Sequence, residues 1–220
     1  MINTRTFITG VACLWLSAAT LLANAAAPDF DAELLAIQTD WATANYQLPE
    51  KDRGAAFDKL EQRAAAFAKQ YPDRAEPLIW EGIVLSTAAG VKGGLGALGL
   101  AKESREKLDA AIKINPDALQ GSAYTSLGTL YHKVPGFPLG FGSDKKAKEY
   151  LEKALAINPA GIDPNYFYGE FLYDDGQYAE AQKYLEKALN APPRPDRKSA
   201  DEGRRKEIEA LLARTRKELS

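Results

Sequence analysis

The sequence has little of the chemistry on which most enzymes depend. Its 220 residues include one cysteine, one histidine and one methionine. Cys13 lies inside an apolar N-terminal run, so the rest of the chain can form no disulfide and carries no reactive thiol. His132 has no second histidine or later cysteine with which to build a zinc site. We therefore predict that the protein is not an enzyme and has no cofactor and no metal site.

The charge of the chain also lacks a strong bias. Lys and Arg number 28 and Asp and Glu 30, and the two signs are interspersed. A nucleic-acid-binding surface needs a basic patch or stripe, which this pattern does not supply. We predict no nucleic-acid partner.

Long apolar runs are confined to the N-terminus. Arg5 precedes the apolar stretch 7–22, and Ala23-Asn24-Ala25 follows it. This order is typical of a secretory signal peptide, here residues 1–25, and the alternative is an uncleaved anchor. We expect cleavage, a periplasmic location, and no stable membrane insertion of the mature protein.

The remainder of the sequence contains an internal repeat. Four positions of the first copy return 34 residues later: Ala147, Leu151, Ala154 and Pro159 recur as Ala181, Leu185, Ala188 and Pro193. Within each copy the small and apolar residues share one face of a helix. A period of this length predicts a stacked array of helical hairpins.

The residues before each copy complete a family pattern. Tyr124-x-x-Leu127-Gly128-x-x-Tyr131 precedes the first copy, and a looser version centred on Gly169 precedes the second. An earlier unit contains Gly82 and Ala111. Over roughly residues 75–195 the chain resembles the tetratricopeptide repeat (TPR) family. The resemblance implies an all-α, right-handed superhelix of antiparallel helix pairs, in which Gly128 should touch Ala147.

The predicted organisation places a degenerate hairpin in residues 26–72, the repeat array in 73–196 and a capping helix in 197–220. Asp117-x-x-Gln120 is typical of a capping box at a helix start. In the last helix Ile208 and Leu212 should face inward, and Arg204 and Arg214 should lie mostly on its outer side.

Two stretches rich in glycine and proline interrupt the array, at 90–99 and 134–142. Such a density should break a helix, and both stretches fall in the turn between the two helices of a repeat. We therefore expect them to be neighbours in space. The G-x-G-x-x-G run at 94–99 lacks the preceding strand that a dinucleotide site needs, so we interpret it as a turn.

The candidate binding residues surround the second interruption and the aromatic helix after it. They are Thr129, His132, Phe137, Phe141, Tyr166, Glu170 and Tyr173. Phe137 and Phe141 are predicted to fold over Tyr166 and Tyr173 and form a partly closed aromatic pocket with Glu170 at its floor. A bound ligand could cover the same face instead.

Two functions are compatible with this organisation. The first is a periplasmic scaffold that binds a protein or peptide partner in its concave groove. The alternative is a small-ligand-binding transport accessory, because residues 131–147 resemble the periplasmic T-component proteins of TRAP transporters.

Overall fold

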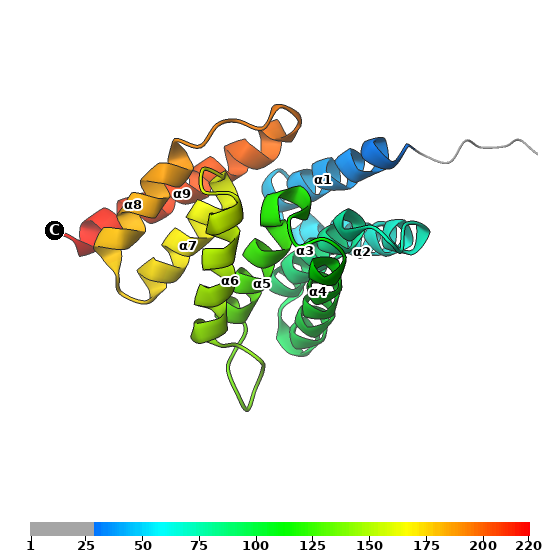
Figure 1. Cartoon of the computed structure of the whole chain (residues 1–220), viewed down its shortest axis with the longest axis horizontal. Coiled ribbons are helices and arrows are strands. Elements are labelled where there is room, and N and C mark those ends of the chain that lie inside the picture. The colour runs from blue at the N-terminus through cyan, green and yellow to red at the C-terminus, as the bar shows by residue number, and fades with distance from the viewer. Residues whose placement is uncertain (1–28) are drawn as a thin grey trace, which may run out of the picture.

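The computed structural model describes residues 29–220, and the predicted signal peptide lies outside this range. The described chain is helical, with one isolated bridge between Gly136 and Gly142 in place of any strand (Figure 1). Its elements are α1 (Phe30–Tyr46), α2 (Glu50–Gln70), α3 (Ala75–Lys92), α4 (Gly94–Ile114), η1 (Ala118–Gly121), α5 (Ser122–Lys133), α6 (Asp144–Ile157), α7 (Ile162–Asp174), α8 (Tyr178–Leu189), η2 (Pro195–Arg197) and α9 (Lys198–Glu218).

Helices α1 to α8 form four consecutive hairpins, as predicted, and α9 follows them. None of the helices from residue 29 onward has both the length and the apolar character that crossing a membrane requires.

A glycine in the first helix allows close packing in three of the hairpins. A Cβ atom at Gly82 would lie 2.7 Å from Leu108, one at Gly128 would lie 2.6 Å from Leu151, and one at Gly169 would lie 2.9 Å from Leu185. A real Cβ cannot approach so closely, so glycine is what lets these helix pairs meet. The hypothetical Cβ at Gly128 would also lie 3.1 Å from the carbonyl oxygen of Ala147, which confirms the predicted contact.

The two copies of the 34-residue unit bury the same face. The shared positions of α6 and α8 are completely buried: Ala147, Leu151, Ala154, Ala181, Leu185 and Ala188. Ser143 caps α6 by accepting a hydrogen bond from the backbone N–H of Lys146 at 3.4 Å. Helical spacing of small and apolar residues is thus sufficient to set the register of these hairpins.

The two interruptions are neighbours, as predicted, but only one of them is a loop. Residues 94–99 continue as the start of α4, and the break between α3 and α4 is confined to Gly93 and Gly94, with φ of 59° and 65°. The prediction of a glycine-rich turn there is wrong, because the extra residues lengthen α3 and α4. A Cβ at Gly140 would lie 3.4 Å from Leu98, so the base of the second interruption rests beside the start of α4.

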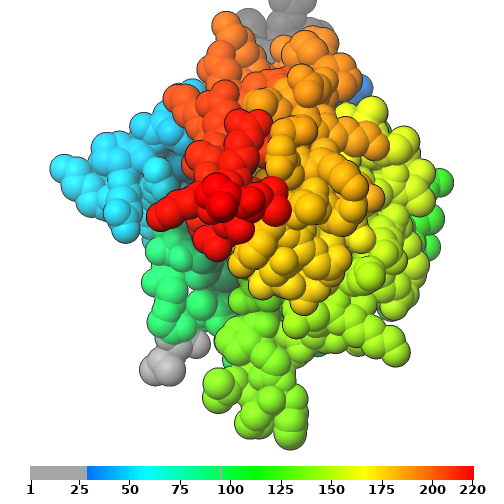
Figure 2. Space-filling model, turned by 90° about the vertical axis from the view of Figure 1, so that its left-hand side faces the viewer, coloured from blue at the N-terminus to red at the C-terminus, as the bar shows by residue number. Residues whose placement is uncertain are grey.

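The last helix returns to the first. Helix α9 packs on α8, α7 and α1, and its orange start lies beside α1 in Figure 1. In Figure 2 the red end of α9 lies against the C-terminal hairpin. Ile208 and Leu212 are buried, as predicted. Arg204 is only 8% exposed, so the expectation that it lies on the outer side is wrong.

Candidate functional site: the concave groove

A groove of about 870 Å³ runs along the described chain. Its walls come from the first helix of every hairpin, α1, α3, α5 and α7, because these helices stack on one another along the inside of the array. Residues 192–197 and the start of α9 close one side. The apolar part of the lining includes Trp41, Trp80, Ile83, Leu119, Leu130 and Phe167.

Several polar side chains in the groove are already engaged. The indole N–H of Trp41 donates to Thr87 Oγ1 at 3.0 Å, and Thr87 donates in turn to the Ile83 carbonyl at 2.8 Å. Thr129 donates to the Thr125 carbonyl at 2.9 Å. Gln38 and Ser126 line the same groove and make no side-chain hydrogen bond with any residue of the described chain. These two can therefore bond to a ligand.

A chain of alternating acidic and basic side chains, ending on a tyrosine hydroxyl, closes one side of the groove. We call this set the clasp: Asp201, Arg194, Asp163, Arg204, Glu207 and Tyr46. Arg194 donates to Asp201 at 2.7 Å and to Asp163 at 2.8 Å. Arg204 donates to the other oxygen of Asp163 at 2.9 Å.

The clasp continues from Arg204 to the first helix. Arg204 donates to Glu207 at 2.6 Å, and the hydroxyl of Tyr46 donates to the same carboxylate at 3.2 Å. The clasp thereby connects α7, the segment before α9, α9 itself and α1. It holds the last helix across the open end of the superhelix.

The electrostatics of the clasp favour ionised Asp163. Burial alone would raise its pKa, but Arg204 and Arg194 together lower the pKa of this carboxyl to about 2. Burial raises the pKa of Tyr46 and Tyr166, which lie beside Arg204. At neutral pH the clasp therefore contains an ionised aspartate between two arginines, with neutral tyrosines around it.

A strained turn forms another part of the groove wall. Leu119 and Gln120 have φ of 49° and 56°, in the left-handed region that side chains with a Cβ rarely occupy. Helix α5 begins only at Ser122, so the capping box predicted at Asp117 is wrong. Strain of this kind is often stored at binding sites, since the surrounding structure must hold it in place.

Of the seven candidate binding residues, Thr129 lines this groove. His132 lies at the end of α5, where Nε2 is 2.8 Å from Asp174 and Nδ1 is 3.4 Å from Asp144. Glu170 is not a free floor carboxylate, because Lys133 Nζ lies 3.2 Å from it. As binding residues the seven remain a prediction.

The predicted aromatic pocket does not form. Phe137 is 94% exposed at the tip of the 134–142 loop, which projects at the bottom of the molecule in Figures 1 and 2. Phe141 packs edge-on against Tyr131, under the guanidinium of Arg105.

Helix α9 covers the face that this loop was expected to cover. Arg204 lies 4.5 Å from the ring centroid of Tyr166, and Arg214 lies 4.7 Å from that of Tyr173. A guanidinium over an aromatic ring is attracted to the ring face, so these arginines cover the face in place of an apolar loop.

The sequence reasoning missed the residues that dominate the groove. Trp41 and Trp80 come from the first two hairpins and meet edge to face, with centroids 6.0 Å apart. Arg194 lies at the end of the predicted repeat array and Arg197 at the start of the predicted capping helix, and neither was a candidate binding residue. The arginine among the prolines of 192–195 was a usable signal, because a rigid segment holds a charged side chain at small entropic cost.

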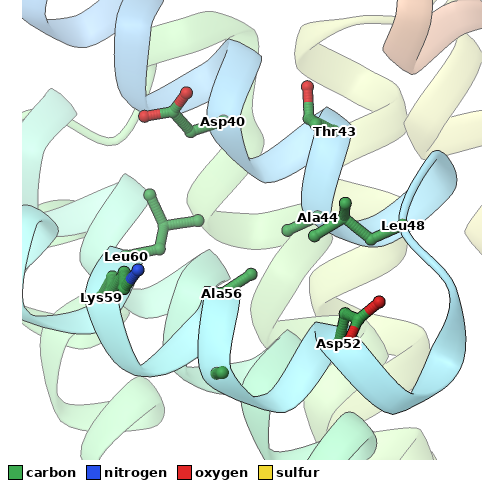
Figure 3. A pocket seen from close by; sticks show the side chains of 9 residues that line it. Asp40, Thr43, Ala44, Leu48, Asp52, Ala56, Lys59 and Leu60 are labelled. Carbon is green, nitrogen blue, oxygen red and sulfur yellow. The ribbon is translucent and has the colours of Figure 1, made fainter.

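A smaller cavity of about 380 Å³ separates α1 from α2. Figure 3 shows its lining: Asp40, Thr43, Ala44, Leu48, Asp52, Ala55, Ala56, Lys59 and Leu60. Only two consecutive helices and the turn between them contribute, and alanines at the helix interface leave the space. Across residues 29–220, no group of three or more His, Cys, Asp or Glu side chains is placed to hold a metal ion.

Comparison with known proteins agrees with this architecture. Residues 145–200, which include α6, α7 and α8, match the family model described as "Tetratricopeptide repeat". The search of curated proteins gave no match. The match supports the TPR family, and the helices packed in adjacent pairs give the chain an all-α, TPR-like fold.

Proposed function

We propose that this protein is an exported scaffold whose concave groove binds a segment of a partner protein. TPR repeats are typical of protein-interaction scaffolds, and repeat arrays bind along their concave surface. The observation that carries the proposal is the groove of about 870 Å³ between the four inner helices. An extended segment lying in it would contact all four hairpins in turn.

The chemistry of the lining supports a polypeptide partner. Apolar and aromatic walls accept side chains, and a few placed polar groups fix orientation. Trp80 and Phe167 supply such walls, and Gln38 and Ser126 supply uncommitted polar groups. These groups suit the alternating apolar and amide character of a peptide.

One observation favours the alternative of a small-ligand transport accessory. The clasp and residues 192–197 close one side of the groove, so a compact ligand could be largely enclosed. A volume of this size also lies within the range of small-molecule sites, roughly 300–1,000 Å³.

Export is part of the proposal and has its own test. We expect N-terminal sequencing of the protein from a periplasmic extract to begin near Ala26, because Ala23-Asn24-Ala25 matches the small-x-small cleavage pattern. Protein that retains Met1 in the membrane fraction would contradict cleavage.

A tryptophan placed in the groove should block binding. Ser126 lines the cavity and makes no side-chain hydrogen bond within the described chain, so Ser126→Trp fills the groove at small structural cost. We expect peptides selected from a random library against the wild-type protein to bind this variant at least about tenfold more weakly, as judged by calorimetry.

Lys183→Trp is the matched control, because Lys183 is exposed on α8 outside the groove. It should bind the selected peptides as the wild type does. Equal binding by Ser126→Trp would show that peptides bind elsewhere. Failure to select any peptide would favour the small-ligand alternative.

A further inference from the structure

One arginine of the groove has no ion pair. Three arginines line the cavity, and Arg194 and Arg204 both bind Asp163. Arg197 makes no ion pair and no side-chain hydrogen bond with any residue between 29 and 220, and its Nε is buried. Its guanidinium carbon lies 4.8 Å from the ring centroid of Trp80.

The backbone holds Arg197 in this place, and the carboxylates of Asp163 and Asp201 act on it only from beyond ion-pair distance. Pro195 begins the short helix η2, and the N–H of Arg197 donates to the Arg194 carbonyl at 3.0 Å. Arg194 is itself anchored to Asp201 and Asp163. Burial, and then the charge of Arg194, lower the pKa of Arg197 to about 10, so it is still protonated at neutral pH.

Trp80 offers a second uncommitted donor. Its side chain is in the groove wall, the residue is 3% exposed, and its indole Nε1 has no acceptor in the described part of the chain. In the neighbouring Trp41, by contrast, the indole Nε1 donates a hydrogen bond to Thr87 Oγ1. Buried donors are nearly always bonded, so two adjacent ones without acceptors indicate a place where a ligand supplies the oxygen.

We infer that Arg197 and Trp80 form an anion subsite of the groove, which takes a carboxylate or phosphate group of the bound ligand. A guanidinium offers two parallel donors that match either group, and the indole ring under it restricts its plane. The apolar remainder of the ligand would contact Trp41, Ile83 and Phe167. The inference rests on the proposed function in one respect: the scaffold proposal makes the molecule that carries the anion a segment of a partner protein.

Small probes test the subsite separately from any partner. Benzoate and phenyl phosphate carry the two candidate anions on an apolar ring, and benzamide is the uncharged match of benzoate. The readout is the ¹H–¹⁵N signal of the Trp80 indole, assigned with Trp80→Phe. The backbone amide signal of Lys183, which lies on α8 outside the groove, serves as an internal reference. We expect at least one anion to shift the Trp80 signal with about tenfold or greater preference over benzamide. The anion that binds more tightly identifies the group.

Arg197→Gln should abolish that preference and leave benzamide binding unchanged. Because Arg197 has no ion pair to break, we expect its thermal midpoint to stay near that of the wild type, and Arg197→Lys should keep part of the preference. Arg216→Gln, which removes an exposed arginine of α9 outside the groove, should bind all probes as the wild type does.

Three results would overturn the subsite: no binding of either anion at millimolar concentration, equal affinity for anion and benzamide, or an anion preference that survives in Arg197→Gln. Its outcome is distinguishable from that of the proposed function. Arg197-dependent anion binding without selected peptides would support the subsite and contradict the scaffold. Peptide binding without anion preference would support the scaffold and contradict the subsite.

Discussion

Replacing Asp163 by asparagine is expected to lower the free energy of unfolding by about 2–4 kcal/mol at neutral pH. Within residues 29–220 Asp163 is the only carboxylate that Arg194 and Arg204 share. The side chain of Arg204 is 10% exposed and that of Arg194 is 33% exposed. Each arginine binds two carboxylates, so Asp163→Asn leaves Arg194 with Asp201 alone and Arg204 with Glu207 alone. Losing one charge partner from a buried ionic network is strongly destabilising. Here one substitution affects two arginines. Denaturant unfolding of both proteins measures the difference.

The same substitution should change how stability depends on pH. The pKa of Asp163 is lowered to about 2 in the folded protein, and an unfolded aspartate has a pKa near 3.9. A lowered pKa means that the contribution is fully present above about pH 4 and is lost as the pH falls through about 2. The difference between wild type and Asp163→Asn should therefore be constant from pH 7 to about 4 and shrink below it.

Asp73→Asn is the matched control, because Asp73 is exposed and makes no ion pair within the described chain. We expect it to change stability by less than about 0.5 kcal/mol. An effect of Asp163→Asn as small as that of the control, or one that does not change with pH, would show that the clasp does not hold the fold together.

The repeats could be predicted because their signals are local. Gly128, Ala147 and Leu151 lie within one hairpin, and helical spacing alone places them on facing sides. The same reasoning predicted the neighbouring interruptions, since equivalent turns of a stacked array share one edge. It failed for residues 94–99, where glycine density suggested a break and packing between long helices prevailed over propensity.

The groove could not be predicted because its contacts join distant parts of the chain. Tyr46 meets Glu207 across 161 residues, and Arg204 meets Asp163 across 41. The periodicity of the sequence does not predict contacts between residues so far apart in the chain. The polar face of α9 was interpreted as solvent-facing, but its Arg204 binds Asp163 and lies over the ring of Tyr166. A charged helix can thus close a groove when the surface that it meets is also charged.

Replacing Gly203 by leucine is expected to lower the free energy of unfolding by at least about 3 kcal/mol, because α9 touches α1 at this residue. Even a Cβ atom at Gly203 would overlap the ring of Tyr46. That ring cannot swing aside freely, since it packs edge-on against Trp41 at 5.6 Å and its hydroxyl bonds to Glu207. Overpacking a rigid site costs typically 1–3 kcal/mol, and a whole leucine side chain should reach or exceed the top of that range.

The test of Gly203→Leu separates lost closure from a general loss of stability. Gly54→Leu is the control, because Gly54 is also helical and a Cβ there meets no atom within 4 Å. We expect that control to be neutral or stabilising by up to about 1 kcal/mol, since leucine is the better helix former. Acrylamide quenching of tryptophan fluorescence under native conditions should increase in Gly203→Leu alone, because displacement of α9 uncovers Trp80. A stable Gly203→Leu variant with unchanged quenching would mean that α9 does not close the groove against α1 in solution.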